Sequence, residues 1–189
     1  MDKLAPRYTT TADLIMPGEG LKQHALLIAF GAILVALCAQ IEIPLQPVPI
    51  TGQTFGVLFI AALLGAKRGA SAILAYLTAG AAGLPVFAGG SAGMHVFAGP
   101  TAGYLIGFVA AAYLVGYLSE RGWDQKLWTA IASMTLGTLV IFFFGVIGLL
   151  RFTGVEQVIQ LGVLPFLPGA AIKIGLAAAL LPQGKRFLG

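Results

Sequence analysis

The stretch Phe166–Leu181 reads FLPGAAIKIGLAAALL and is apolar apart from a single lysine, Lys173. As a helix rising about 1.5 Å per residue, it would place this lysine roughly 12 Å from the start of the stretch. A charge at such depth in a membrane costs at least ~2.5 kcal/mol, so it normally faces a polar cavity, a partner or a ligand. The simpler alternative is a lysine that reaches a lipid headgroup or a helix carbonyl. We favour a ligand contact, because the other apolar stretches contain no acidic residue that could pair with Lys173.

The composition of the whole chain is that of an integral membrane protein. Of its 189 residues 58% are hydrophobic and 10% charged, and the mean hydropathy is +0.93; soluble domains carry about 25% charged residues. Several of its apolar segments are broken by glycine and fall short of the ~20 residues of a perpendicular span, which is typical of helices that end early around a cavity. We predict an all-α bundle of six transmembrane helices, at approximately His24–Ile41, Thr51–Gly65, Gly69–Gly83, Thr101–Leu118, Leu127–Leu150 and Pro165–Leu181.

The positions of the basic residues predict the orientation. With the N-terminus in the cytoplasm, nine of the ten lysines and arginines outside the apolar stretches lie inside and only Arg151 lies outside. This bias follows the positive-inside rule, so we expect a multi-pass protein of the cytoplasmic (inner) membrane with both termini in the cytoplasm. The net charge of +4 then reflects topology and contact with membrane lipid. Nucleic acid is not an expected partner, because no basic cluster alternates with aromatic residues.

The first twenty residues differ from the remainder of the chain. They are of mixed polarity and lack the apolar core and small-residue cleavage site of a signal peptide. We interpret residues 1–20 as a cytoplasmic N-terminal arm and residues 21–189 as a single transmembrane domain.

The two long connections on the predicted outer side are more elaborate than the inner ones. Glu42–Ile50 has three prolines within six residues, which favours a stiff, extended strap. Leu84–Gly99 is apolar, rich in glycine and contains Phe87 and Phe97. We expect this segment to fold back over the outer mouth of the bundle as a re-entrant or lid hairpin.

The sequence lacks the motifs of the common enzyme classes. It has no phosphate-binding loop and no Gly-x-Ser-x-Gly elbow, and neither its two histidines nor the lone Cys38 lies in a metal-binding spacing. We therefore expect no enzymatic activity, no cofactor and no metal. Binding of a small polar molecule fits better. Its candidate contacts, beside Lys173, are the polar groups near the outer mouth and the backbone of the glycine-rich hairpin: Thr51, Gln53, Thr54, Gly90, Ser91, His95, Thr101 and Tyr104.

Small residues form a stripe at helical spacing along the first apolar helix. The stripe contains Ala25, Ala29, Ala32 and Ala36, and such stripes let helix backbones approach closely. It serves either packing within the bundle or docking of another membrane subunit.

Three strings carry a resemblance to a known family: PVPITGQTFGV at 47–57, GAAGLPVFAGG at 80–90 and GPTAGYLIGF at 99–108. In this order and spacing they resemble the BioY family, the biotin-specific substrate-binding (S) components of energy-coupling factor transporters. The resemblance implies a six-helix bundle that binds biotin at its outer end. It also implies partners, a membrane T component and two cytoplasmic ATPases (BioN- and BioM-like), which alone bind ATP. In the family a small-x-x-x-small motif docks the T component, and Ala25-x-x-x-Ala29 and Ala32-x-x-x-Ala36 match it.

The chain departs from the family pattern at one position. The pattern on the last helix is Pro-x-Asp-x-x-Lys, whose Asp and Lys contact biotin, whereas this chain has Pro168, Ala170 and Lys173 at those places. One alternative is therefore an S component for a biotin-like vitamin. A second is a self-sufficient transporter, alone or as a homo-oligomer, that needs no ATPase. A third is a structural subunit that binds no solute.

Overall fold

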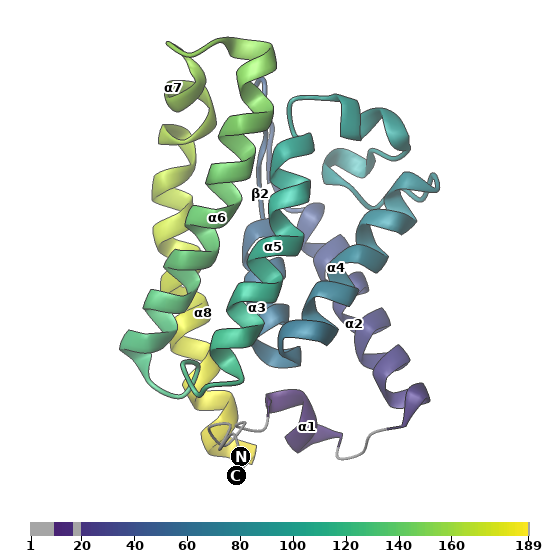
Figure 1. Ribbon diagram of the computed structural model, residues 1–189, viewed down its shortest axis with the longest axis vertical. Helices are drawn as coiled ribbons and strands as arrows, with labels where there is room; N and C mark the ends of the chain where they lie inside the picture. The colour runs from purple at the N-terminus through teal and green to yellow at the C-terminus, as the bar shows by residue number, and fades with distance from the viewer. Residues whose placement is uncertain (1–9, 17–19, 189) are drawn as a thin grey trace, which may run out of the picture.

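The computed structural model describes residues 10–16 and 20–188 as a bundle of helices (Figure 1). Helices α2 and α4 lie on one side of the bundle, α6 and α8 on the other, and α3 and α5 between them. In chain order the α-helices are α1 (Thr11–Ile15), α2 (Leu21–Ala39), α3 (Gln53–Leu64), α4 (Ala66–Ala81), α5 (Ala102–Ser119), α6 (Leu127–Thr153), α7 (Val158–Gly162) and α8 (Leu167–Leu188). Three short 3₁₀ helices join them: η1 (Ala88–Gly90), η2 (Met94–Ala98) and η3 (Leu164–Phe166).

Each of the six predicted apolar segments contains a helix, although their lengths differ. In the described part of the chain, four helical stretches are long and apolar enough to cross a membrane: Leu21–Ala39, Ala102–Ser119, Leu127–Thr153 and Val158–Gln183. The remaining two, α3 with 12 residues and α4 with 16, are shorter. Helix α6 runs three residues past the predicted end, because no helix breaker follows Leu150 until Gly154.

The outward face of α2 has the character of a helix surrounded by lipid or by another apolar surface. On its inward face the buried residues are spaced four apart: Leu27, Gly31, Val35 and Ala39. The opposite faces present large apolar side chains that are 55–64% exposed: Leu26, Phe30, Ile33 and Leu37. A helix that is apolar all round is typical of a membrane span.

Glycine allows a close contact between α5 and α6. A methyl group on Gly103 would overlap the backbone oxygen of Phe144 and approach Gly148 to 3.0 Å. The two backbones therefore meet directly here, which is how small residues bring helices together in membranes.

The predicted proline strap forms a small strand pair. Residues Glu42–Ile43 (β1) pair antiparallel with Ile50–Thr51 (β2). The two ends of the predicted strap are extended, but its middle bends so that the strap pairs with itself, which the sequence pattern does not indicate. This pairing is the one departure from an all-α fold in the described residues, and it returns the chain to the end of α2 so that α3 can begin at Gln53.

The Leu84–Gly99 segment folds against the end of α4 as two 3₁₀ turns (Figure 1). Phe87 is 2% exposed and fills the space in front of Gly80, where a methyl group would overlap its ring. The Gly93 N–H also donates to the Gly80 carbonyl at 2.7 Å. A role of this segment as a lid remains a prediction.

The N-terminal arm is helical where it is described. Helix α1 has a capping box, in which Thr10 and Asp13 exchange hydrogen bonds. It contacts α3 and α8, and Asp13 forms an ion pair with Arg68 at 2.7 Å. Residues 1–9 and 17–19 of the predicted arm lie outside the described residues. Helix α1 and the end of α8 lie at the same end of the bundle (Figure 1).

Candidate binding site

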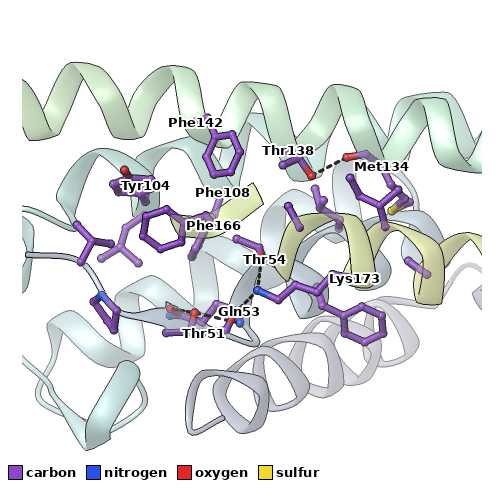
Figure 2. Close-up of a pocket in the computed structure, with 18 of the residues that line it drawn as sticks. Thr51, Gln53, Thr54, Tyr104, Phe108, Met134, Thr138, Phe142, Phe166 and Lys173 are labelled. Carbon is purple, nitrogen blue, oxygen red and sulfur yellow. Dashed lines mark hydrogen bonds between the residues drawn. The ribbon is translucent and has the colours of Figure 1, made fainter. Parts of the chain in front are cut away.

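A pocket lies between α3, α5, α6 and α8, with the end of the strap beside it (Figure 2). Its empty volume is about 740 Å³, which includes the open side. The lining residues are mostly apolar: Val48, Pro49, Thr51, Gln53, Thr54, Phe55, Leu58, Thr101, Tyr104, Leu105, Phe108, Met134, Thr138, Phe142, Phe166, Ala170, Lys173, Ile174 and Ala177.

Aromatic rings build one wall of the pocket. The ring centroid of Phe166 lies 6.3 Å from that of Phe142 and 6.0 Å from that of Tyr104. The Tyr104 hydroxyl donates to the Gly162 carbonyl at 2.7 Å. Its polar end is therefore satisfied by the protein, and its ring remains as an apolar surface for a ligand.

The opposite corner is polar and contains the lysine (Figure 2). The Lys173 ammonium donates to the Thr51 carbonyl and, at 2.9 Å, to the Thr54 hydroxyl. The Thr51 hydroxyl donates in turn to Oε1 of Gln53 at 2.9 Å. An ammonium has three N–H donors, so these two bonds leave one for a ligand. Lys173 thus reaches a backbone carbonyl, but that carbonyl belongs to strand β2 at the pocket and not to a helix, as the simpler alternative had it.

The structure brings six of the nine predicted contact residues together and leaves three elsewhere. The pocket is lined by Thr51, Gln53, Thr54, Thr101, Tyr104 and Lys173, although Gln53 and Tyr104 make internal hydrogen bonds as well. The lining set does not include Gly90, Ser91 and His95, which belong to the Leu84–Gly99 segment. The Ser91 hydroxyl donates to the Ala88 carbonyl of its own turn at 2.8 Å. Ligand contacts by these three residues remain predictions.

Sequence reasoning missed most of the wall contributed by α6 and α8. A signal existed in the segment of η3 and α8, because Phe166 at the end of η3 and then Ala170, Lys173 and Ala177 of α8 follow one another at intervals of four, three and four residues, the spacing of one helix face. All four line the pocket. On α6 the lining residues Met134, Thr138 and Phe142 also repeat every four residues.

Ala170, at the position of the family aspartate, faces the same pocket one turn before Lys173. None of the described residues that line the pocket is acidic. Its only formal charge is therefore the lysine, which favours a ligand with an anionic or strongly accepting group.

The predicted docking stripe lies on α2, away from the pocket. Ala25 and Ala29 are exposed, whereas Ala32 and Ala36 are partly buried and pack against the core. Half of the stripe is therefore available to another helix. Docking itself remains a prediction.

The fold and the site together define a class, that of multi-pass helical membrane proteins that bind a small molecule within the bundle. Comparison with known proteins defines the family. A profile of the BioY family matches residues 9–189. Similar chains include the biotin transporter BioY of Rhizobium etli, 41% identical over 161 residues that cover 80% of this chain and 86% of that one. The biotin transporter BioY of Thermotoga maritima is 39% identical over 155 residues, which cover 82% of this chain and 90% of that one.

A solved structure has the same fold. The S-component for biotin from an ECF-type ABC transporter superposes with a TM-score of 0.77 at 26% sequence identity, covering 89% of this chain and 95% of that one. The chain belongs to the BioY family, a family of transporters and not of enzymes.

Proposed function

We propose that this chain binds biotin in the pocket between α3, α5, α6 and α8 and carries it across the cytoplasmic membrane as the substrate-binding component of an energy-coupling factor transporter. One observation carries the proposal: in a chain of the BioY family, an aromatic-walled pocket holds a single cation and several hydrogen-bonding groups at one corner. The names of the similar proteins support biotin over another vitamin.

The chemistry of biotin matches the two sides of the pocket. Biotin is a polar ureido ring fused to an apolar tetrahydrothiophene ring, which carries an apolar chain that ends in a carboxylate. The aromatic residues Phe108, Phe142 and Phe166 suit the apolar ring and chain. The corner supplies the Gln53 amide, which can donate and accept as a ureido group requires, and the Lys173 ammonium, which can pair with an anion.

The direct test is retention of radiolabelled biotin by the detergent-purified chain, in competition with unlabelled analogues. We expect biotin to compete fully. Lipoate, which has a carboxylate and a sulfur ring but no ureido group, should compete poorly. Biotin methyl ester, which lacks the anionic charge, reports whether Lys173 meets the carboxylate. A chain that retains no biotin refutes the proposal.

Energy for transport would come from partners, a membrane T component and two ATPases, with no cofactor bound to this chain. Transport would proceed by capture from outside, closure of the strap and of the Leu84–Gly99 segment, and reorientation of the bundle. The exposed Ala25 and Ala29 on α2 support docking to a T component, because small residues allow close helix approach. Uptake that persists in cells lacking every such ATPase would favour self-sufficient transport.

The docking proposal has a matched pair of variants. Ala29→Trp puts a bulky ring on the stripe, and Leu37→Trp puts one on a different exposed face of the same helix. We expect only Ala29→Trp to reduce co-purification with the T component, while biotin binding by the isolated chain survives. Equal co-purification of both variants would assign the stripe to lipid contact.

Orientation is tested by labelling single cysteines from outside the cell, in a background where Cys38 is replaced. A cysteine at Gln46, in the strap, should be labelled, and one at Arg121, between α5 and α6, should not. The opposite pattern would place the termini outside and the strap in the cytoplasm.

A further inference from the structure

Tyr76 lies directly behind the polar corner of the pocket. This residue of α4 is 1% exposed and is not part of the pocket lining. Its hydroxyl oxygen accepts a hydrogen bond from Nε2 of Gln53. The Gln53 Oε1 atom accepts from the Thr51 hydroxyl at 2.9 Å. Both ends of the Gln53 amide are thus held, one by Thr51 of β2 and one by Tyr76 of α4.

This arrangement determines what Gln53 can offer to a ligand. A primary amide has two N–H donors and two acceptor positions on its oxygen. With one donor used by Tyr76 and one acceptor position used by Thr51, one donor and one acceptor position remain in fixed directions. The last torsion of a glutamine side chain is broad, so without Tyr76 the amide would rotate and present either group.

The ring of Tyr76 is in turn held by the Leu84–Gly99 segment. Phe87 packs edge-on against Tyr76, with 5.5 Å between ring centroids and an interplanar angle of 89°. Phe97 packs in the same way on Phe87 at 5.8 Å. Nε2 of Gln40, just past the end of α2, donates to the Phe87 carbonyl at 3.2 Å and fixes this position of the chain.

We propose that Tyr76 is a positioning residue for Gln53, and that the Leu84–Gly99 segment supports ligand binding through Phe87 and Tyr76. The inference rests on the proposed role of the pocket in binding biotin. It gives the segment a function that needs no direct ligand contact, consistent with Gly90, Ser91 and His95 lying outside the lining set.

A double-mutant cycle on the purified full chain tests the link between Tyr76 and Gln53. Tyr76→Phe keeps the ring against Phe87 and removes the hydroxyl, and we expect it to weaken biotin binding about fivefold. Gln53→Ala should weaken binding about tenfold. Because Tyr76 acts through Gln53, the double variant should bind within about twofold of Gln53→Ala alone. Tyr113→Phe, at an exposed tyrosine of α5, is the control and should leave affinity unchanged.

Phe87→Leu extends the cycle to the outer segment. This variant should weaken binding in the parent and have no further effect in the Gln53→Ala background. An effect that persists there would show that the segment reaches the ligand by another route. The melting temperature without ligand is measured for every variant, because a merely structural role of Tyr76 would lower it and leave the cycle additive.

The outcomes separate the two proposals. A parent chain that binds no biotin refutes the proposed function and this inference with it. A parent that binds biotin while Tyr76→Phe has no effect, or while the effects of Tyr76→Phe and Gln53→Ala multiply, refutes the inference alone.

Discussion

The α1 end of the bundle and the pocket use charged side chains in opposite ways. At the end formed by α1, Arg68 donates to the Leu64 carbonyl at 3.0 Å and to the Thr10 hydroxyl at 3.0 Å, and it pairs with Asp13. In the pocket, Lys173 also donates to protein oxygens, but no carboxylate from the described part of the chain lines the site. The charge of Arg68 is balanced by the fold itself, whereas among the described residues no acidic group faces Lys173, so a bound anion could balance its charge.

The two cations should therefore contribute differently to the free energy of unfolding. A partly exposed ion pair such as Asp13–Arg68 contributes less than about 1 kcal/mol to the free energy of unfolding. A buried cation without a counter-ion costs stability, so replacing it with an apolar side chain is often neutral or stabilising. We therefore expect changes at the α1 end to affect stability and changes at the pocket to affect binding.

The largest expected effect is that of Lys173→Met. Methionine keeps the apolar stem and removes the ammonium, and loss of charge-assisted hydrogen bonds to the ligand should weaken biotin binding about a hundredfold. The melting temperature of the ligand-free protein should stay the same or rise. Titration of purified protein with radiolabelled biotin measures the affinity. Lys67→Met, at an exposed lysine near the α1 end, is the control and should not change it. Parental affinity in Lys173→Met would mean that the lysine merely satisfies the Thr51 carbonyl.

A smaller effect is expected when the pocket is given the counter-ion that it lacks. Ala170→Asp places a carboxylate one helical turn before Lys173, on the same face. We expect it to fold, to bind biotin about fivefold more tightly and to reject analogues with an altered ureido ring more strongly. Ala170→Asn has a similar shape without the charge and should give less than half of this gain in binding free energy. Weaker biotin binding by Ala170→Asp would show that an internal ion pair competes with the ligand for Lys173.

The sequence predicted the features that follow from the free-energy cost of placing polar or charged groups in a membrane. Apolar stretches predict helices, and each of the six predicted segments contains one, although only four helical stretches in the described part of the chain are long and apolar enough to cross a membrane. A lone lysine in such a stretch predicts a polar environment, and Lys173 lies in the pocket.

Features that depend on contacts between distant residues were not foreseen. The capping box of Thr10 and Asp13 can be recognised from the local sequence. The hydrogen bond from Arg68 to the Thr10 hydroxyl cannot, because it joins residues 58 positions apart. Helix α6 is apolar on most sides, so its sequence does not reveal which face meets the pocket. The pairing of β1 with β2 likewise depends on where α2 ends and α3 begins.

At the α1 end, Arg68→Met should affect stability and leave binding unchanged. It removes the ion pair to Asp13 and the bonds to Thr10 and the Leu64 carbonyl, and we expect a loss of about 1 kcal/mol in the free energy of unfolding. Thermal unfolding of the ligand-free protein reports this loss. Biotin affinity should remain within about twofold of the parent value, since additivity holds between distant sites. A large loss of affinity would show that α1 and the pocket are coupled, contrary to the separation of roles between the α1 end and the pocket.

The smallest expected effect is the pH dependence carried by Asp13. Burial alone would raise the pKa of its carboxyl group, but hydrogen bonds from Thr10 and the Arg68 guanidinium outweigh it and hold the pKa below its ordinary value of 3.8. The ionised carboxylate therefore stabilises the fold above pH 3.8, and its contribution disappears as the pH falls through the lower pKa of the folded state. Because the carboxylate is one-third exposed, the contribution should be less than about 1 kcal/mol.

Asp13→Asn isolates this contribution, since it keeps the shape and the capping oxygen and removes the charge. The difference in melting temperature between parent and variant should be constant from about pH 5 to 7 and shrink below about pH 4. Biotin affinity should be the same in both proteins across the upper range, because the carboxylate balances Arg68 and not the pocket. A stability difference that grew as the pH fell would mean that the charged form of Asp13 destabilises the fold. The charges at the α1 end would then not be balanced within the fold, contrary to the contrast with the pocket.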